Sequence, residues 1–191
     1  MRIVAGSAKG RKIETPEGMD VRPTTDRVRE ALFSSIAFRI VDNRVLDLFA
    51  GTGALGLEAL SRGAASAVFV DRARKSAALV RRNIERCGFG ARAEVVERDA
   101  ERALRLLAAR GERFDLIFLD PPYAGPLLAA ALETLAQTAL LAPSGVILAE
   151  HPADRVPRPP DGLAIATTKR YGKTVLSFVQ RTLDLEPAEQ Q

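Results

Sequence analysis

Apolar and polar residues alternate along this chain with two different periods. The short apolar runs, which are typical of buried strands, lie at 44–48, 67–70, 94–97, 116–119 and 146–149. Between them, apolar residues recur three and four positions apart, which is helical spacing, at 54–62, 73–86, 100–110 and 127–141. This strand–helix alternation predicts an α/β fold with a mainly parallel sheet and helices on both faces.

The two ends of the chain have other patterns. Residues 162–181 indicate two strands around a tight turn at Tyr171–Gly172, which is an antiparallel hairpin. Residues 1–16 indicate a shorter hairpin that turns between Gly6 and Gly10, and the spacing at 24–38 predicts a helix. We therefore predict a basic hairpin extension over 1–20, one α/β domain over 21–182 and a frayed tail over 183–191.

Composition narrows the class of protein. A chain of 191 residues fits one domain, and none of its apolar runs approaches the roughly 18 residues of a membrane helix. No secretory signal is evident, and Cys87 is the only cysteine, so no intramolecular disulfide is possible and a cytoplasmic location is expected. With one cysteine and one histidine, a structural zinc site is not expected.

Charge adds a weaker indication. The formal net charge is +4, and four basic residues precede the first acidic residue, Glu14. They are Arg2, Lys9, Arg11 and Lys12. Such a cluster is either a solvated surface or a contact for a polyanion such as a nucleic acid.

Four aspartates lie at or just after the ends of successive predicted strands. They are Asp47, Asp71, Asp99 and Asp120. The carboxyl ends of parallel strands meet at one edge of a sheet, where α/β proteins bind their ligands. A single aspartate here is readily explained as a helix cap, but four in succession indicate a ligand with several hydroxyl and amino groups.

The loop after the first strand, FAGTGALG, has the G-x-G-x-x-G spacing of a nucleotide-binding turn. Gly51 and Gly53 would let the backbone approach a ligand closely, and Asp71 is placed to accept ribose hydroxyls. A dinucleotide fits this pattern less well than S-adenosylmethionine, because the carboxylate of Asp47 would repel a pyrophosphate.

S-adenosylmethionine has no phosphate, and its polar groups match the remaining acids. We expect Asp47 to face its amino group and Asp71 its ribose. We expect Asp99, together with the backbone N–H of Ala100, to face its adenine.

The sequence LDPPY at 119–123 carries the candidate chemistry. The lone pair of an exocyclic base amine is delocalised into the ring. If Asp120 and the carbonyl of Pro121 accept hydrogen bonds from the two N–H groups of this amine, its lone pair is turned toward an incoming methyl group. Pro121 and Pro122 stiffen this loop, and Tyr123 would stack on the base. Neither a metal nor a covalent nucleophile is required.

These stretches resemble a known family. VLDLFAGTGALGLEAL with LDPPY resembles class I S-adenosylmethionine-dependent methyltransferases that act on exocyclic amines. RIVAG, KGRKI, RPTTDRVREALF and FLDPPY together resemble, more narrowly, the RsmD family of 16S rRNA guanine-N2 methyltransferases. The resemblance runs from Arg2 to about Tyr123 and resumes at KRYGKTVLSF.

The resemblance implies a Rossmann-like fold with a seven-stranded sheet whose last strand is antiparallel. It implies S-adenosylmethionine as cofactor, S-adenosylhomocysteine as product, no metal, and a guanine 2-amino group of 16S rRNA as substrate, in the small ribosomal subunit or an assembly intermediate. It adds to the expected cofactor contacts Thr24, Phe49, Arg72 and Asp120. The expected RNA contacts are Arg2, Lys9, Arg11, Lys12, Arg22, Arg27 and Tyr123. We expect a monomer and no membrane partner.

Other functions share parts of the pattern. An adenine-N6 or cytosine-N4 methyltransferase has the same D-P-P-Y chemistry, GTGALG also suits an NAD-dependent oxidoreductase, and a basic chain can be a non-catalytic RNA-binding module. Three further residues are interpreted without a catalytic role. We interpret His151 as a cap or a solvated side chain and Cys87 as a small core residue, and Arg29 as either a phosphate ligand or an ion-pair partner.

Overall fold

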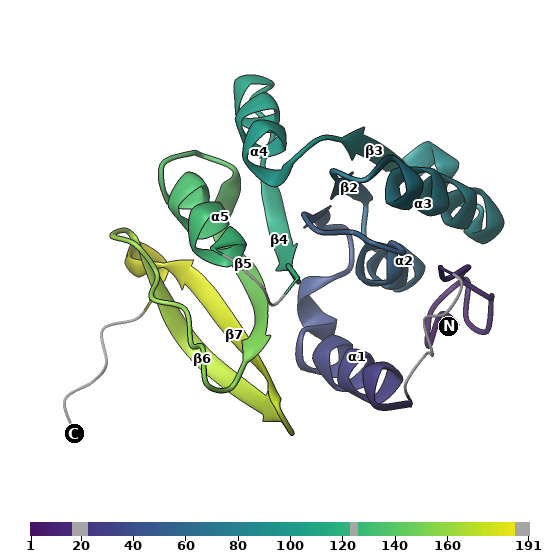
Figure 1. Ribbon diagram of the computed structural model, residues 1–191, viewed down its shortest axis with the longest axis horizontal. Helices are drawn as coiled ribbons and strands as arrows, with labels where there is room; N and C mark the ends of the chain where they lie inside the picture. Colours follow the sequence, from purple (N-terminus) through teal and green to yellow (C-terminus); the bar gives the residue numbers. More distant parts are fainter. Residues whose placement is uncertain (17–22, 123–125, 186–191) are drawn as a thin grey trace.

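The computed structural model describes residues 1–16, 23–122 and 126–185, with only the backbone for 23–28. Within these residues seven strands form one sheet (Figure 1). The strands are Arg44–Asp47 (β1), Ser66–Asp71 (β2), Ala93–Glu97 (β3), Phe114–Leu119 (β4), Leu141–Pro152 (β5), Leu163–Tyr171 (β6) and Thr174–Arg181 (β7). The α-helices are Pro23–Ser35 (α1), Ala54–Ser61 (α2), Arg74–Cys87 (α3), Ala100–Ala109 (α4) and Leu127–Ala136 (α5). Short 3-10 helices lie at Ala37–Arg39 (η1), Gly90–Arg92 (η2) and Thr182–Asp184 (η3).

The strand order across the sheet is β3-β2-β1-β4-β5-β7-β6. Strands β1 to β5 pair in parallel, whereas β7 pairs antiparallel with both β5 and β6. The predicted seven-stranded sheet with an antiparallel last strand is therefore confirmed. The chain moves outward in one direction from β1 and in the other from β4, so the switch point where such sheets bind ligands lies between these two strands.

Helices cover both faces of the sheet. Side chains of α1, α2 and α3, among them Phe33, Leu57 and Val80, share one core with alternate residues of the strands. Side chains of α4 and α5, among them Leu104 and Leu132, share a second core on the opposite face. Because strand side chains alternate between the faces, the nearly continuous apolar runs fill both cores. Among the helices that the structure describes, none is long and apolar enough to cross a membrane.

The N-terminal segment folds back on itself and packs against α2. Arg2 and Lys12 form an antiparallel bridge, and the N–H of Ile3 donates to the carbonyl of Arg11 at 3.0 Å. Ile3 and Ile13 are buried in the same core as α2. A hairpin-like turn was predicted for these residues, and the structure shows that its apolar side chains extend the core of the sheet.

A buried carboxylate fastens this segment to α2. Glu58 has no exposed surface, and its two oxygens accept from the backbone N–H groups of Val4 at 2.8 Å and Ala5 at 3.0 Å. Arg62 donates to Glu58 at 2.8 Å, and Arg29 lies 3.9 Å from it. A carboxylate buried at this depth is tolerated because hydrogen bonds and cations satisfy it together.

Two element boundaries differ from their predictions for local reasons. Helix α1 ends at Ser35, whereas it was predicted to continue to residue 38. At this end the Ser35 hydroxyl donates to the carbonyl of Leu32 at 2.7 Å, and a 3-10 turn follows. Helix α5 ends at Ala136 and β5 begins at Leu141, although a helix was predicted up to residue 141. The carbonyl of Leu140 accepts from the N–H of Phe114 at 2.8 Å, so this apolar run pairs with β4.

Replacing Glu58 with Gln should destabilise the protein by about 3 kcal/mol, because the loss of one partner from a buried ion pair leaves its cations and amides poorly matched. The measurement is the free energy of unfolding in urea. Glu101→Gln is the matched control, since Glu101 forms an exposed pair with Arg105 on α4, and it should change stability by no more than about 0.5 kcal/mol. Equal effects of the two variants would contradict the role of Glu58.

Candidate active site

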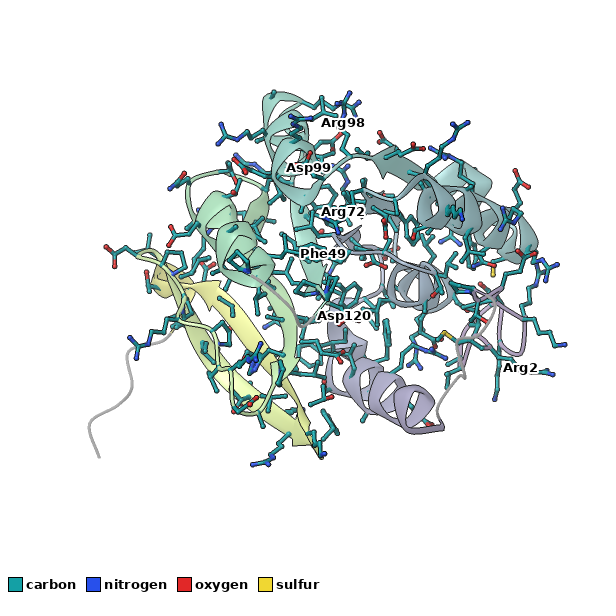
Figure 2. The ribbon with its side chains drawn as sticks, in the orientation of Figure 1. Arg2, Phe49, Arg72, Arg98, Asp99 and Asp120 are labelled. Carbon is teal, nitrogen blue, oxygen red and sulfur yellow. The ribbon has the colours of Figure 1, made fainter. Side chains whose placement is uncertain are left out.

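The four aspartates singled out in the sequence lie at the carboxyl edge of the parallel strands. Asp47 and Asp71 end β1 and β2, Asp99 immediately precedes α4, and Asp120 follows β4. Figure 2 shows the labelled side chains of Asp99, Arg72, Phe49 and Asp120 following one another from the start of α4 to the end of β4. The predicted convergence on one edge is therefore observed, and the local partners of each acid distinguish their roles.

Asp47 holds the glycine loop in place through a hydrogen bond to the first turn of α2. Its side chain is buried, and one carboxylate oxygen accepts from the N–H of Gly56 at 3.0 Å. Burial, helped by the nearby charge of Asp71, raises the pKa of Asp47 to about 7, while the Gly56 hydrogen bond opposes the shift. A cation beside Asp47 would restore its ionised form.

Glycines shape the loop between β1 and α2. Gly51 has a φ of 55°, a left-handed conformation that favours glycine, and space is open where its side chain would stand. A Cβ on Gly56 would lie 2.3 Å from the ring of Phe69, so this glycine permits close packing of α2 on β2. The Asp71 carboxylate accepts from the N–H groups of Gly51 at 2.9 Å and Ala73 at 2.8 Å.

Asn83 on α3 also holds this loop, and sequence reasoning assigned it no role. It is fully buried, and its side-chain amide donates to the carbonyl of Thr52 at 2.9 Å. Its oxygen accepts from the N–H of Glu14 at 2.8 Å. Asn83 therefore links the glycine loop to the N-terminal segment. A polar residue on the buried face of a helix was the available signal, but its partners are far away in the sequence.

Asp99 is a helix cap as well as a candidate ligand. One of its oxygens accepts from the N–H of Arg102 at 3.0 Å, which satisfies one of the free donors at the start of α4. Ala100 is the first residue of this helix, where the backbone N–H has no intrahelical acceptor. Phe49 is half-buried and Arg72 is exposed beside them. This part of the edge therefore combines one apolar ring with several polar groups.

Asp120 lies where β4 ends. The residue as a whole is exposed, yet protein atoms crowd its carboxyl group, and this desolvation raises its pKa. The charges of Glu150 and Asp47 raise the pKa of Asp120 further. Pro121 is buried and Pro122 is exposed. Tyr123 lies outside the described residues, so its predicted stacking role stays a prediction.

Glu150 is the acidic neighbour that sequence reasoning missed. It lies at the carboxyl end of β5, half-buried, and its charge acts on Asp120. Its signal was the same one that identified the aspartates, a carboxylate at the end of an apolar strand. The side chains of Asp47, Asp120 and Glu150 together make an acidic centre that suits a cation or a group rich in N–H donors.

The predicted RNA-contacting residues are not gathered at this centre. The side chains of Arg2, Lys9, Arg11 and Lys12 are exposed on the N-terminal segment. Figure 2 shows Arg2 on the N-terminal segment, away from Asp120. Arg11 donates to the carbonyl of Arg86 at 2.7 Å, which also makes it a structural contact with α3. The predicted positions Arg22, Thr24 and Arg27 have side chains outside the described residues.

The structure contradicts the interpretation of His151, decides between the two interpretations of Arg29 and agrees with that of Cys87. His151 is buried rather than capping or solvated, and its ring nitrogens lie 2.8 Å from the Ser177 hydroxyl and 2.9 Å from the Pro152 carbonyl. Arg29 is a buried ion-pair partner, which leaves its guanidinium inaccessible to phosphate. Cys87 is a buried core residue, as predicted. Pairing of β5 with β7 explains the environment of His151.

Comparison with known proteins identifies the family of this chain. The family described as Conserved hypothetical protein 95 matches residues 1–180. Ribosomal RNA small subunit methyltransferase D of Escherichia coli K12 is 37% identical over 182 residues, which are 95% of this chain and 90% of the relative. The protein of that name from Haemophilus influenzae is 33% identical over 174 residues, 90% of this chain and 89% of its own.

A solved structure shares the whole architecture. A hypothetical protein from Thermus thermophilus is 36% identical, with a TM-score of 0.79 over 93% of this chain and 98% of its own. The glycine loop, the acidic strand ends and the D-P-P sequence of this chain all lie within the matched residues 1–180. The chain therefore belongs to the Conserved hypothetical protein 95 family, which is the RsmD family of class I methyltransferases.

Proposed function

We propose that this protein transfers the methyl group of S-adenosylmethionine to the 2-amino group of a guanine in the 16S rRNA of the small ribosomal subunit. The observation that carries the proposal is Asp120-Pro121-Pro122 at the end of β4, adjoining the buried Asp47 and the glycine loop after β1. Family membership supports the reaction class, and relatives are named for the small-subunit rRNA. An rRNA substrate also supports a cytoplasmic location for the protein, because ribosomes assemble there.

The residues at the carboxyl edge fit S-adenosylmethionine, which supplies an activated methyl group on a sulfonium cation. Each oxygen of Asp71 accepts one backbone N–H and keeps lone pairs for a ribose diol. The N–H of Ala100 is available to an adenine ring nitrogen. Phe49 offers an apolar surface, and Asp47 offers the negative charge that an amino group would neutralise.

The chain activates and positions the base amine. Asp120 and the carbonyl of Pro121 accept its N–H bonds, so the nitrogen lone pair turns toward the methyl group. As the amine gains positive charge, the carboxylates of Asp120 and Glu150 stabilise it. The raised pKa of Asp120 also gives this carboxylate a higher proton affinity, which suits it to receive the proton that the methylated amine loses.

Basic residues on the N-terminal segment are proposed to hold the RNA backbone. The exposed Lys9 and Lys12 lie on the turn and the return arm of that segment. Glu58 fixes the first arm of the segment on α2 through Val4 and Ala5, and the bridge between Arg2 and Lys12 joins the return arm to it, so the lysines are presented on a supported turn. The target base must leave its stack to reach Asp120, as in other enzymes that modify a base.

The three alternatives are less well supported. A dinucleotide would place its pyrophosphate over the buried Asp47, which is repulsive. A non-catalytic module has no use for an acidic centre that raises the pKa of its own carboxyl groups. An adenine or cytosine methyltransferase shares the D-P-P chemistry, and the identity of the labelled nucleoside separates it from the proposed enzyme.

Purified protein should transfer label from tritiated S-adenosylmethionine to small subunits from a strain that lacks the modification, and nuclease digestion should place it in N2-methylguanosine. Asp120→Ala should lower the rate by at least about 100-fold, since a positioned acceptor for the amine is lost. Asp161→Asn, in an exposed loop, is the control and should retain the rate. Label in methyladenosine or methylcytidine would overturn the base assignment, and an active Asp120→Ala would overturn the mechanism.

Binding of S-adenosylhomocysteine should weaken by about tenfold between pH 8 and pH 6. The pKa of Asp47 is about 7 in the free protein, so lower pH neutralises the carboxylate that pairs with the ligand amine, and binding must release a proton. Titration calorimetry in buffers of different ionisation enthalpy counts that proton. Asp47→Asn can still accept from Gly56, and it should bind more weakly with a smaller pH dependence. An unchanged pH dependence in this variant would contradict the assignment.

Replacing Lys9 and Lys12 together with Gln should lower RNA affinity equally for all sequences. It should also reduce the slope of log affinity against log salt by about two, one for each lost phosphate contact. Filter binding over a salt series measures both quantities. Arg105 and Arg110, which are exposed on and just after α4, serve as the control pair when replaced with Gln. A larger loss in the control pair would place the RNA on α4 instead of the N-terminal segment.

A further inference from the structure

Glu150 stands beside Asp120 on the same face of the sheet. Strands β4 and β5 are parallel neighbours (Figure 1), and Leu119 is in register with Ala149, so the next residues along the two strands are Asp120 and Glu150. Phe118 and Leu148, two positions earlier on each strand, pack in the core under α1 and α2. Because strand side chains alternate, Asp120 and Glu150 project from this same face.

Glu150 places a second carboxylate next to Asp120. Glu150 is half-buried, and its antiparallel partner on β7 is the apolar Leu176. The adjacent acids repel one another, and after burial the charge of Glu150 is the next cause that raises the pKa of Asp120. Like charges gathered at a strand end are typical of functional sites. Carboxylate oxygens accept hydrogen bonds, so two adjacent N–H donors would be suitable partners for this pair.

Guanine presents such donors on its Watson–Crick edge. Its 2-amino group and its N1–H are adjacent, and both donate hydrogen bonds. The N1 of adenine and the N3 of cytosine, which adjoin the exocyclic amine in those bases, carry lone pairs and would be repelled by a carboxylate. Two neighbouring acids therefore match guanine and oppose the other two amino bases.

We propose that Glu150 accepts the N1–H of the target guanine and thereby selects this base while Asp120 holds the 2-amino group. This inference rests on the proposed function and adds a base-selecting residue to the same site. Glu150 also interacts within the protein, and a carboxylate has lone pairs for more than one donor. Selection then arises from two carboxylates on adjacent strands, so it requires no separate recognition domain.

The test compares guanine with 2-aminopurine at the target position of reconstituted small subunits. 2-Aminopurine keeps the 2-amino group but has a lone pair in place of the N1–H. The wild-type protein should prefer guanine by about tenfold or more in kcat/KM. Glu150→Gln should lose about tenfold on guanine, and its guanine-to-2-aminopurine ratio should fall toward one, because a Gln amide can donate to the bare N1.

Two controls separate base selection from other effects. Glu133→Gln, exposed on α5 over the opposite face of the sheet, should keep the wild-type ratio. The affinity of Glu150→Gln for S-adenosylhomocysteine should stay within about twofold of wild type. A loss of that affinity with an unchanged base ratio would make Glu150 a cofactor contact and overturn the proposal.

Failure of this inference is distinguishable from failure of the proposed function. If the wild-type protein methylates 2-aminopurine as well as guanine, the base-selecting role is wrong while the methyltransferase reaction stands, and this comparison needs no variant. If Glu150→Gln forms N2-methylguanosine with the wild-type ratio, the role is again wrong. If the wild-type protein forms no N2-methylguanosine at all, the proposed function itself falls, and the inference falls with it.

Discussion

The hydrogen bond from the N–H of Gly56 to the buried Asp47 fixes the geometry on which the whole site depends. It ties the end of β1 to the start of α2 and so holds the glycine loop across the switch point of the sheet. Asp71 and Asn83 grip the same loop from β2 and α3. Burial raises the pKa of Asp47, so its ionised form is costly in the free protein. A site organised in this way gains most from a positively charged ligand, because the ligand supplies the charge that offsets this cost.

The distribution of charge also constrains how RNA approaches. The protein carries a net charge of +4, yet its site gathers carboxylates at the ends of β1, β2, β4 and β5. Such a centre repels phosphate, so the backbone of an RNA has to stay outside while a neutral base enters. The basic N-terminal segment offers a surface for that backbone. The basic segment attracts the RNA phosphates and the carboxylates repel them, so both effects would orient the RNA with its target base toward the site.

Much of this arrangement could be predicted from sequence, and the failures have physical reasons. Strand periodicity located Asp47, Asp71 and Asp120 at one edge because parallel strands must end together. It could not identify the partner of Asn83 or the burial of His151, since both depend on contacts between distant segments. The apolar run at Leu140 suited a helix as well as a strand, and pairing with β4 decided the outcome. Glu150 followed the same rule as the aspartates but lay in a stretch with little family resemblance.

The position of β7 also affects how the protein is made. This strand is synthesised last of the seven, yet it lies between β5 and β6. While a ribosome is still adding residues 174–181, β5 has an open edge and β6 has no neighbour in the sheet. The sheet can therefore close only after β7 has been made, and until then the exposed edge of β5 is a site for aggregation. Slow synthesis of residues 174–181 would prolong that vulnerable state.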